Sequence, residues 1–170
     1  MRTRTKGALG AMSAAALAGA VTFIGRWEGL ELDAYRDIVG VWTVCYGETR
    51  GVGPNDRRTR SECDAMLASG IREFEGRLMA CLPERGTPAA DSYAELPDGA
   101  KIALVSWSYN VGTGAACAST LARRVREGNL TAACEELSRW NRAGGRVIRG
   151  LTNRRGAERA LCLASLKEDA

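Results

Sequence analysis

Residues 26–49 read RWEGLELDAYRDIVGVWTVCYGET, and this stretch carries most of the information about the fold. From residue 33 to residue 55 the chain is rich in valine, threonine, tyrosine and tryptophan, interrupted by glycines at Gly40, Gly47 and Gly51. Short runs of β-branched and aromatic residues bounded by glycines predict strands and turns. We therefore expect a small antiparallel sheet over residues 33–55.

The chain after this sheet has the pattern of amphipathic helices. Residues 59–62 read TRSE, a capping box, and apolar residues at helical spacing follow as far as about Cys81, before Pro83. A loop is predicted from Pro83 to Pro97. Four further helical patterns, separated by glycine-bearing turns, cover residues 98–109, 119–127, 130–140 and 151–166. We therefore expect an α+β fold with a small sheet lobe, a larger helical lobe and a cleft between them.

Composition limits the chemistry that the chain can perform. The 170 residues suit one catalytic domain with an N-terminal appendage. There is no histidine, so Ser-His-Asp, Cys-His and zincin-type catalysis are excluded. Catalysis must rest on carboxylates, hydroxyls, thiols or lysines. The net charge of +4 fits an anionic partner such as a cell-wall polymer, a membrane surface or a nucleic acid, but it also fits solubility alone.

The N-terminal segment has the form of an export signal. Arg2, Arg4 and Lys6 precede nineteen uncharged residues, Gly7 to Gly25. As a helix this stretch would rise ~28 Å, about the thickness of a bilayer's hydrocarbon core. Seven of its residues are alanine and four are glycine, so it should hold only weakly in the membrane.

Four interpretations of this segment stay open. It could be a cleaved signal peptide, because residues 18–20 read AGA and have the small-x-small form of a cleavage site. It could be a permanent anchor, a signal anchor that later leaves the bilayer, or a hydrophobic helix buried in a soluble protein. The division that we expect is a signal-anchor over residues 1–25 and a catalytic domain over residues 26–170.

The cysteines predict disulfides. Their count is even, none lie in a C-x-x-C pair, and they are Cys45, Cys63, Cys81, Cys117, Cys134 and Cys162. Three disulfides in an oxidising compartment have fifteen possible connectivities, and six free thiols are the alternative. Cys63 and Cys81 would lie ~27 Å apart on one continuous helix, which excludes that pair.

Two carboxylates in the opening stretch are candidates for catalysis. Glu28 stands beside Trp27 at the end of an apolar segment, where partial burial would favour the protonated acid. Asp37 follows in polar sheet surroundings. A protonated acid and an ionised carboxylate facing each other across a cleft can cleave a glycosidic bond. On residue inventory alone, a helix-end glutamate and a turn aspartate without function explain the same pattern.

The spacing of Glu28, eight residues, Asp37, five residues and Thr43 resembles the catalytic signature of the phage-type lysozymes, or endolysins, of glycoside hydrolase family 24. The resemblance covers residues 26–162. Four further stretches carry it: SYNVG at 108–112, STL at 119–121, WNR at 140–142, and GLTNRR at 150–155 with Glu158.

This resemblance implies a lysozyme-like fold and an inverting hydrolysis of the β-1,4 bond between N-acetylmuramic acid and N-acetylglucosamine. It implies Glu28 as general acid, Asp37 as the carboxylate that positions and activates water, and Thr43 as the partner of Asp37. No cofactor, no metal and no nucleic acid are implied. The expected partner is peptidoglycan.

Four further residues receive substrate-binding or supporting roles from the resemblance: Tyr46, Glu48, Asn110 and Arg154. Arg154 matches the arginine that pairs with the catalytic glutamate in related enzymes, although a solvated helix face is the alternative for it. Glu48 stands where family members commonly have a histidine. This second carboxylate could perturb Asp37 or face solvent, and both possibilities stay open. Trp42, Trp107 and Trp140 are expected in the core or lining the cleft.

The resemblance extends to the signal-anchor-release endolysins, which are held inactive in the host inner membrane and become active in the periplasm. Glu28 would lie within ~5 Å of the membrane face while the anchor spans the bilayer, so its cleft would be incomplete. The anchor contains no cysteine, so activation through an anchor thiol is unavailable. A monomer is expected after release.

Related sequences also suggest a disulfide pairing, Cys45 with Cys63, Cys81 with Cys117, and Cys134 with Cys162. Three other functions remain possible at this stage: a wall-binding module without activity, a membrane-disrupting peptide with a folded tail, and a chitin-degrading relative. The intact residues Glu28, Asp37 and Thr43 argue against the first. The charged remainder of about 140 residues argues against the second.

Overall fold

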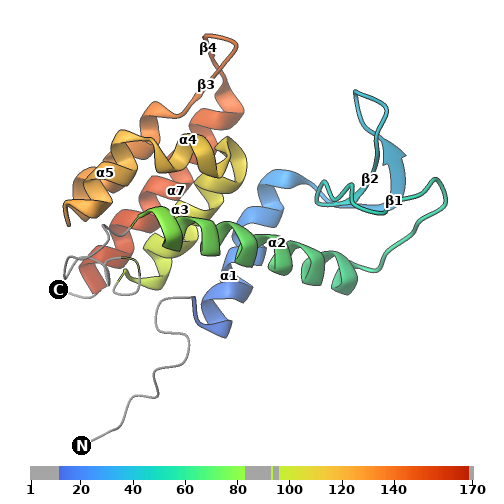
Figure 1. The fold of residues 1–170 in the computed structure, drawn as a ribbon, viewed down its shortest axis with the longest axis horizontal. Coiled ribbons are helices and arrows are strands. Elements are labelled where there is room, and N and C mark those ends of the chain that lie inside the picture. The colour runs from blue at the N-terminus through green and yellow to red at the C-terminus, as the bar shows by residue number, and fades with distance from the viewer. Residues whose placement is uncertain (1–11, 83–92, 94–95, 169–170) are drawn as a thin grey trace, which may run out of the picture.

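The computed structural model describes residues 12–82, 93 and 96–168 of the chain. A long helix, α2 (Arg60–Cys81), joins a small sheet lobe to a larger helical lobe, as Figure 1 shows. The sheet lobe contains β1 (Glu31–Arg36) and β2 (Trp42–Cys45), which pair antiparallel. The expected α+β, lysozyme-like fold is confirmed.

The sheet is smaller than the sequence pattern predicts. Regular pairing ends at Cys45, and residues 46–58 form turns with two isolated bridges, Asp33 to Arg57 and Val44 to Glu48. Gly47 and Gly51 both have positive φ, a conformation that turns the chain and interrupts a strand. The valine- and aromatic-rich pattern therefore overestimated the length of the sheet.

The capping box that begins α2 is confirmed. Thr59 Oγ1 accepts a hydrogen bond from the backbone N–H of Glu62, and the Glu62 carboxylate accepts one from the backbone N–H of Thr59. These two bonds satisfy donors that a helix start leaves unpaired. The helix then continues without a break to Cys81, so it separates Cys63 from Cys81 as expected.

The helical lobe is built around α3 (Asp98–Val111), in which every residue from Ala100 to Ser108 is buried. The predicted helices are confirmed with shifts of a few residues at their ends. They correspond to α3, α5 (Thr120–Arg126), α6 (Leu130–Glu136) with the 3-10 helix η2 (Leu137–Arg139), and α7 (Arg149–Glu168). The predicted loop at residues 83–97 lies largely outside the described residues.

Two elements were missed by the sequence pattern. The first is the short helix α4 (Thr113–Cys117). The second is a hairpin of β3 (Arg142–Ala143) and β4 (Arg146–Val147), which turns at Gly144 and Gly145, both with positive φ. Strands of two residues leave no periodic signal, and the two glycines were recognised only as a turn.

The disulfide pairing suggested by related sequences is confirmed. The pairs are Cys45 with Cys63, Cys81 with Cys117, and Cys134 with Cys162. They tie the sheet lobe to α2, α2 to α4, and α6 to α7. The disulfides therefore link these elements covalently, in addition to the packing of the core.

The N-terminal helix α1 (Ala14–Glu28) packs into the domain. Ser13 caps it by accepting a hydrogen bond from the backbone N–H of Ala16. Its buried face meets α2 and α3 and consists of Ala16, Ala20, Phe23 and Ile24. The helix passes without a break through residue 25, where the sequence interpretation divides anchor from catalytic domain.

The expected membrane anchor is only partly covered by the structure. Residues 1–11, including Arg2, Arg4 and Lys6, lie outside the described part of the chain. Among the described residues, no helix is both long and apolar enough to cross a membrane. The division into residues 1–25 and 26–170 therefore stays a prediction.

A buried polar cluster holds Met12, just before α1, against α2. The backbone N–H of Met12 donates to Glu75 Oε1 at 2.6 Å, and Arg72 donates both to the Met12 carbonyl and to Glu75 Oε2. The Tyr93 hydroxyl also donates to Glu75 Oε1, at 3.2 Å. The Glu75 side chain is 1% exposed, and these donors replace the water that it loses.

Candidate active site

Glu28 is the last residue of α1 and faces a pocket between the lobes. Gly29 ends the helix with a φ of 78°, which only glycine adopts readily, and turns the chain into β1. The pocket has a volume of about 430 Å³ and is lined by Glu28, Gly29, Glu31, Tyr35 and Cys45. The Glu28 side chain is 22% exposed, so its carboxyl is reachable from the pocket while the helix covers its stem.

Arg154 holds the Glu28 carboxyl from the helical lobe. Its Nη1 lies 2.8 Å from Glu28 Oε1, and its side chain is 5% exposed. Nε donates to Glu158 Oε1 at 3.2 Å, and Nη2 donates to the Ser106 carbonyl at 3.1 Å. Because two of the guanidinium nitrogens are fixed by Glu158 on α7 and Ser106 on α3, Arg154 positions the Glu28 carboxyl with the third.

A second arginine completes this buried network. Arg155 Nε lies 2.9 Å from Glu158 Oε2, and Arg155 Nη2 donates to Asn110 Oδ1 at 3.2 Å. The structure thus places Asn110 against Arg155, at the end of α3. Two guanidiniums therefore surround one buried carboxylate, that of Glu158.

Asp37 lies at the turn between β1 and β2. Its Oδ1 accepts hydrogen bonds from the backbone N–H groups of Val39, at 3.0 Å, and Val41, at 2.8 Å. Among the described residues, no group donates a hydrogen bond to Oδ2. One oxygen therefore anchors the carboxylate in the turn, and the other is available to a ligand.

Thr43 is buried on β2, with its hydroxyl donating to the Val41 carbonyl at 3.1 Å. It pairs directly with Tyr35, so both side chains lie on one face of the hairpin. Tyr35 also lines the Glu28 pocket. The hairpin thus presents Thr43 on the face that the helix end with Glu28 meets.

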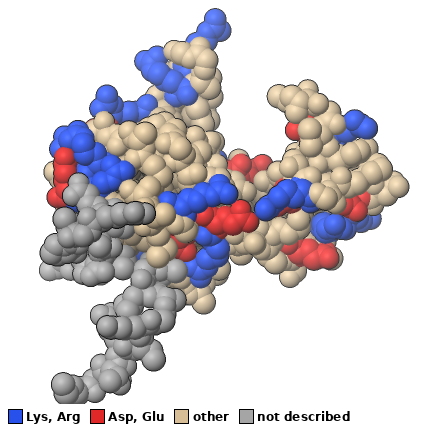
Figure 2. All heavy atoms as spheres, viewed as in Figure 1, with Lys and Arg blue, Asp and Glu red and all other residues tan. Residues whose placement is uncertain are grey.

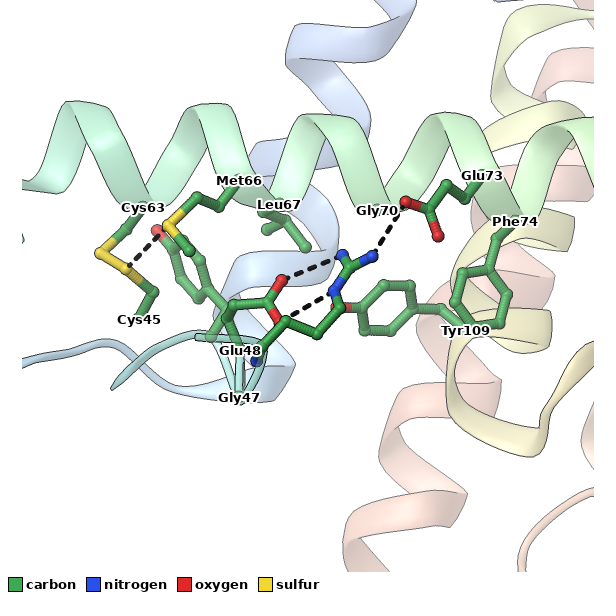
Figure 3. Close-up of a pocket in the computed structure, with 12 residues that line it drawn as sticks. Cys45, Gly47, Glu48, Cys63, Met66, Leu67, Gly70, Glu73, Phe74 and Tyr109 are labelled. Atoms are coloured by element: carbon green, nitrogen blue, oxygen red, sulfur yellow. Dashed lines mark hydrogen bonds and ion pairs between the residues drawn. A yellow bond between two sulfur atoms is a disulfide. The ribbon is translucent and has the colours of Figure 1, made fainter. Parts of the chain in front are cut away.

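A second pocket of about 210 Å³ adjoins the first, since Cys45 lines both. Figure 3 shows Glu48 and Glu73 converging on one guanidinium there, that of Arg50. Arg50 Nη2 lies 3.1 Å from Glu48 Oε2, and Arg50 Nη1 lies 3.3 Å from Glu73 Oε1 on α2. Arg50 therefore bridges the sheet lobe and α2.

The surroundings of Glu48 favour its ionised form. The hydrogen bond from Arg50 lowers the pKa of Glu48, and the backbone N–H groups of Arg50 and Thr49 act in the same direction. Glu48 is therefore paired with Arg50 rather than with Asp37 or with solvent alone. Its charge is neutralised within its own loop.

Tyr109 lies between the two acid clusters. Burial raises the pKa of its hydroxyl, and the negative charges of Glu28 and Glu48 raise it further. Its ring packs against Phe74 with centroids 4.8 Å apart, and Gly70 opposite leaves room for it. The neutral phenol therefore forms part of the wall of the 210 Å³ pocket.

Tyr46 is buried and lines the 210 Å³ pocket. Its hydroxyl donates to Asp64 Oδ1 at 2.7 Å, and burial followed by this bond raises the pKa of the phenol. A Cβ at Gly25 would meet the ring at 3.0 Å. Tyr46 therefore lies between α1 and α2, where its ring packs against the helix that carries Glu28.

The tryptophans fall in the core and at its edge, as expected. Trp107 is fully buried, and Trp140 packs against it edge-on with ring centroids 5.2 Å apart. Trp42 is partly buried, and Arg36 stacks over its ring.

Sequence reasoning missed several residues of the site. Tyr109 and Glu158 lie in stretches that were singled out, but no role was assigned to them. Arg50 and Glu73 are 23 residues apart and belong to no motif, so nothing in the sequence indicates that they meet. The structure brings Glu28 into contact with Arg154, while Asp37 and Thr43 bond within the neighbouring hairpin. A carboxyl held beside a pocket is suited to acid-base cleavage.

Comparison with known proteins shows a family match over most of the chain. The family model for phage lysozyme matches residues 25–158. A SAR-endolysin of Pseudomonas phage phiKMV is 37% identical over 158 residues, which cover 91% of this chain and 89% of that protein.

Solved structures show the same fold. The active form of the P1 phage endolysin Lyz superimposes with a TM-score of 0.72 at 28% identity, covering 91% of this chain and 86% of that one. The secreted inactive form of the same endolysin gives a TM-score of 0.53 at 23% identity, with coverage of 86% and 94%. The backbone arrangement here is therefore closer to that of the active form.

Proposed function

The chain belongs to the phage lysozyme family and is a lysozyme, and we propose that it hydrolyses the β-1,4 bond between N-acetylmuramic acid and N-acetylglucosamine in peptidoglycan. The observation that carries the proposal is that Glu28, on the wall of the 430 Å³ pocket, is held by the buried Arg154. A carboxyl held by a buried guanidinium at a cleft between lobes is equipped for acid catalysis on a bound polymer.

In this proposal Glu28 is the general acid. It donates its proton to the glycosidic oxygen as the bond from that oxygen to the anomeric carbon breaks. A water molecule attacks the anomeric carbon from the opposite face, and Asp37 takes up its proton through Oδ2. The Oδ1 bonds to the turn between β1 and β2 keep the carboxylate aimed while the proton moves. Thr43 orients the same water from the neighbouring position on the hairpin.

Attack by water on the face opposite the leaving group inverts the anomeric configuration. The anomer released first from purified sacculi is therefore expected to be the α-form. Nuclear magnetic resonance of the fresh product measures this directly. A β-anomer at early times would contradict inversion, and new N-acetylglucosamine reducing ends would contradict the bond assignment.

We also propose that the enzyme is inactive while its N-terminal segment is in the host inner membrane, and becomes active as a monomer in the periplasm. In the described structure Ala16, Ala20, Phe23 and Ile24 fill the core between α2 and α3. A segment that spans a bilayer cannot fill that core. The end of α1 that carries Glu28 would then not be held in position. The greater likeness to the active P1 endolysin supports the same interpretation.

The second candidate for this segment is a cleaved signal peptide. Cleavage after Ala20 would remove half of α1, including two of its four core residues, Ala16 and Ala20. Mass spectrometry of the periplasmic enzyme separates the two: an intact N-terminus is expected, and a chain beginning at residue 21 would contradict release.

A further inference from the structure

The hairpin of β3 and β4 carries an unusual concentration of positive charge. From residue 137 to residue 157 the chain contains no aspartate or glutamate but six arginines. Arg154 and Arg155 are buried with Glu158, and Arg139 pairs with Glu136. The other three are exposed and form no ion pair with any described residue: Arg142, Arg146 and Arg149.

These charges do not serve the fold. Arg142 Nη1 donates to the Gly145 carbonyl across the turn, a bond that needs no net charge. Arg149 is the first residue of α7, where a positive charge opposes the helix dipole. Three unpaired cations close together also repel one another. Their arrangement is therefore better suited to an anionic ligand than to stability.

The hairpin stands beside the catalytic residues. Arg154, which holds Glu28, lies five residues after Arg149 on α7, or ~7.5 Å along the helix axis. In Figure 1 the two hairpins project from their separate lobes toward the same side of the molecule. Figure 2 shows basic side chains on the projecting β3–β4 hairpin and no acidic ones on the visible face of that projection.

We propose that this cationic hairpin, defined by Arg142, Arg146 and Arg149, binds the carboxylates of the peptidoglycan stem peptides beside the scissile bond. The inference rests on the proposed function, because only that substrate brings such peptides to the site. The N-acetylated sugars are neutral, whereas the stem peptides carry free carboxylates. Three extended residues span ~10 Å, which is comparable with the ~7.5 Å along α7 between Arg149 and Arg154, the residue that holds Glu28.

Exposed apolar side chains on the same hairpin suit a peptide ligand. Val147 is 54% exposed and Ile148 is 40% exposed, next to Arg146 and Arg149. An anionic lipid surface would match the same chemistry. A bilayer against this face, however, would cover the side toward which both hairpins project. A peptide on the substrate strand fits the placement without blocking it.

The test compares two substrates and two triple variants. The hairpin variant is Arg142→Gln, Arg146→Gln and Arg149→Gln. The matched control removes the same charge from exposed arginines elsewhere: Arg57→Gln, Arg60→Gln and Arg77→Gln. Each is assayed on intact sacculi and on glycan strands stripped of stem peptides by an amidase. Thermal unfolding confirms that both variants fold.

We expect kcat/KM of the hairpin variant to fall about tenfold on intact sacculi and by clearly less on peptide-free strands. Those strands have lost the peptide carboxylates and keep only the lactyl carboxylate that the amidase exposes on each N-acetylmuramic acid. The control variant should keep the wild-type ratio between the two substrates. An equal loss on both substrates, or no loss on either, would overturn the inference while leaving the proposed function standing.

Binding to vesicles of anionic phospholipid tests whether the hairpin recognises lipid instead of peptide. If the hairpin variant loses vesicle binding but cleaves intact sacculi like the wild type, the hairpin recognises lipid and the proposal is wrong. If the wild type cleaves neither glycan substrate, the proposed function itself fails and the inference fails with it.

Discussion

Arg154 Nη1 lies 2.8 Å from Glu28 Oε1, which joins the end of the first helix to the last helix across 126 residues of sequence. The guanidinium is buried and also donates hydrogen bonds to Glu158 and Ser106. Its removal therefore leaves more than one buried acceptor without a donor. Arg154→Gln is expected to lower the free energy of unfolding by about 3 kcal/mol. Urea denaturation followed by circular dichroism measures this change.

Arg154→Lys is the matched control for that substitution. It keeps the charge but cannot reach Glu28, Glu158 and Ser106 together. Its loss of stability should be smaller than that of Arg154→Gln, while sacculus cleavage should fall in both variants. Wild-type cleavage by Arg154→Gln would show that the pair does not position the acid.

The Glu48–Arg50 pair gives stability a defined pH dependence. The hydrogen bond from Arg50 lowers the folded-state pKa of Glu48, so its contribution is present above the ordinary value of 4.5 and is lost as the pH falls through the folded value. Glu48→Gln should therefore cost up to about 1 kcal/mol at pH 7, since the pair is partly exposed. The difference should shrink as the pH falls below 4.5 and through the lowered folded-state pKa.

Urea midpoints of wild type and Glu48→Gln across this pH range check the prediction. Arg50→Gln removes the other partner and should produce the same flattening. A constant difference between wild type and Glu48→Gln from pH 7 to pH 3 would mean that the charge of Glu48 is not what stabilises the loop.

Glu75 should matter far more than its neighbour on α2. Glu75→Ala leaves the Met12 N–H, the Arg72 guanidinium and the Tyr93 hydroxyl without their shared acceptor. A loss of about 3 kcal/mol is expected. Glu73→Ala, on the exposed side of the helix, should cost less than about 1 kcal/mol.

Hydrogen exchange locates the effect of Glu75→Ala. The amides in the first turns of α1 should exchange faster than in the wild type, because the cluster fastens the start of that helix. Unchanged protection in α1, with faster exchange elsewhere, would refute this role of the cluster.

The release of the N-terminal segment can be slowed without disturbing the folded enzyme. Ala15 and Ala18 are exposed on α1, so Ala15→Leu with Ala18→Leu strengthens membrane insertion by roughly 0.5 kcal/mol each and leaves the core unchanged. Gly19→Leu is less suitable, because a Cβ there already meets Ile102 at 3.4 Å. Delayed lysis of the host is expected.

The matched control is Ala15→Ser with Ala18→Ser, which weakens insertion and should bring lysis forward. Purified released enzyme of both variants should cleave sacculi like the wild type. Unchanged lysis timing in both would argue that the segment does not control activity.

Local patterns in the sequence were enough for the helices and for the candidate acids. The capping box at Thr59 and the end of the apolar helix at Glu28 are properties of neighbouring residues, so they could be predicted. The cysteine count left fifteen connectivities, and only the resemblance to related sequences pointed to the pairing that the structure confirms.

Contacts between distant residues could not be predicted in this way. Arg50 meets Glu73 across 23 residues, and Met12 meets Glu75 across 63. The supporting role expected for Tyr46 stays a prediction, and its contact with Asp64 on α2 depends on how α1 and α2 pack. Such contacts follow from the packing of whole helices, which no local pattern specifies.

The central claim is that Glu28 donates the proton that breaks the glycosidic bond. Glu28→Gln keeps an oxygen that can accept the hydrogen bond from Arg154 but has no acidic proton. The direct measurement is the rate of reducing-end release from purified sacculi, with sacculus binding and the urea midpoint measured on the same preparation. A fall of roughly 10²–10⁴-fold with binding intact is the predicted result, and release at the wild-type rate would contradict the account.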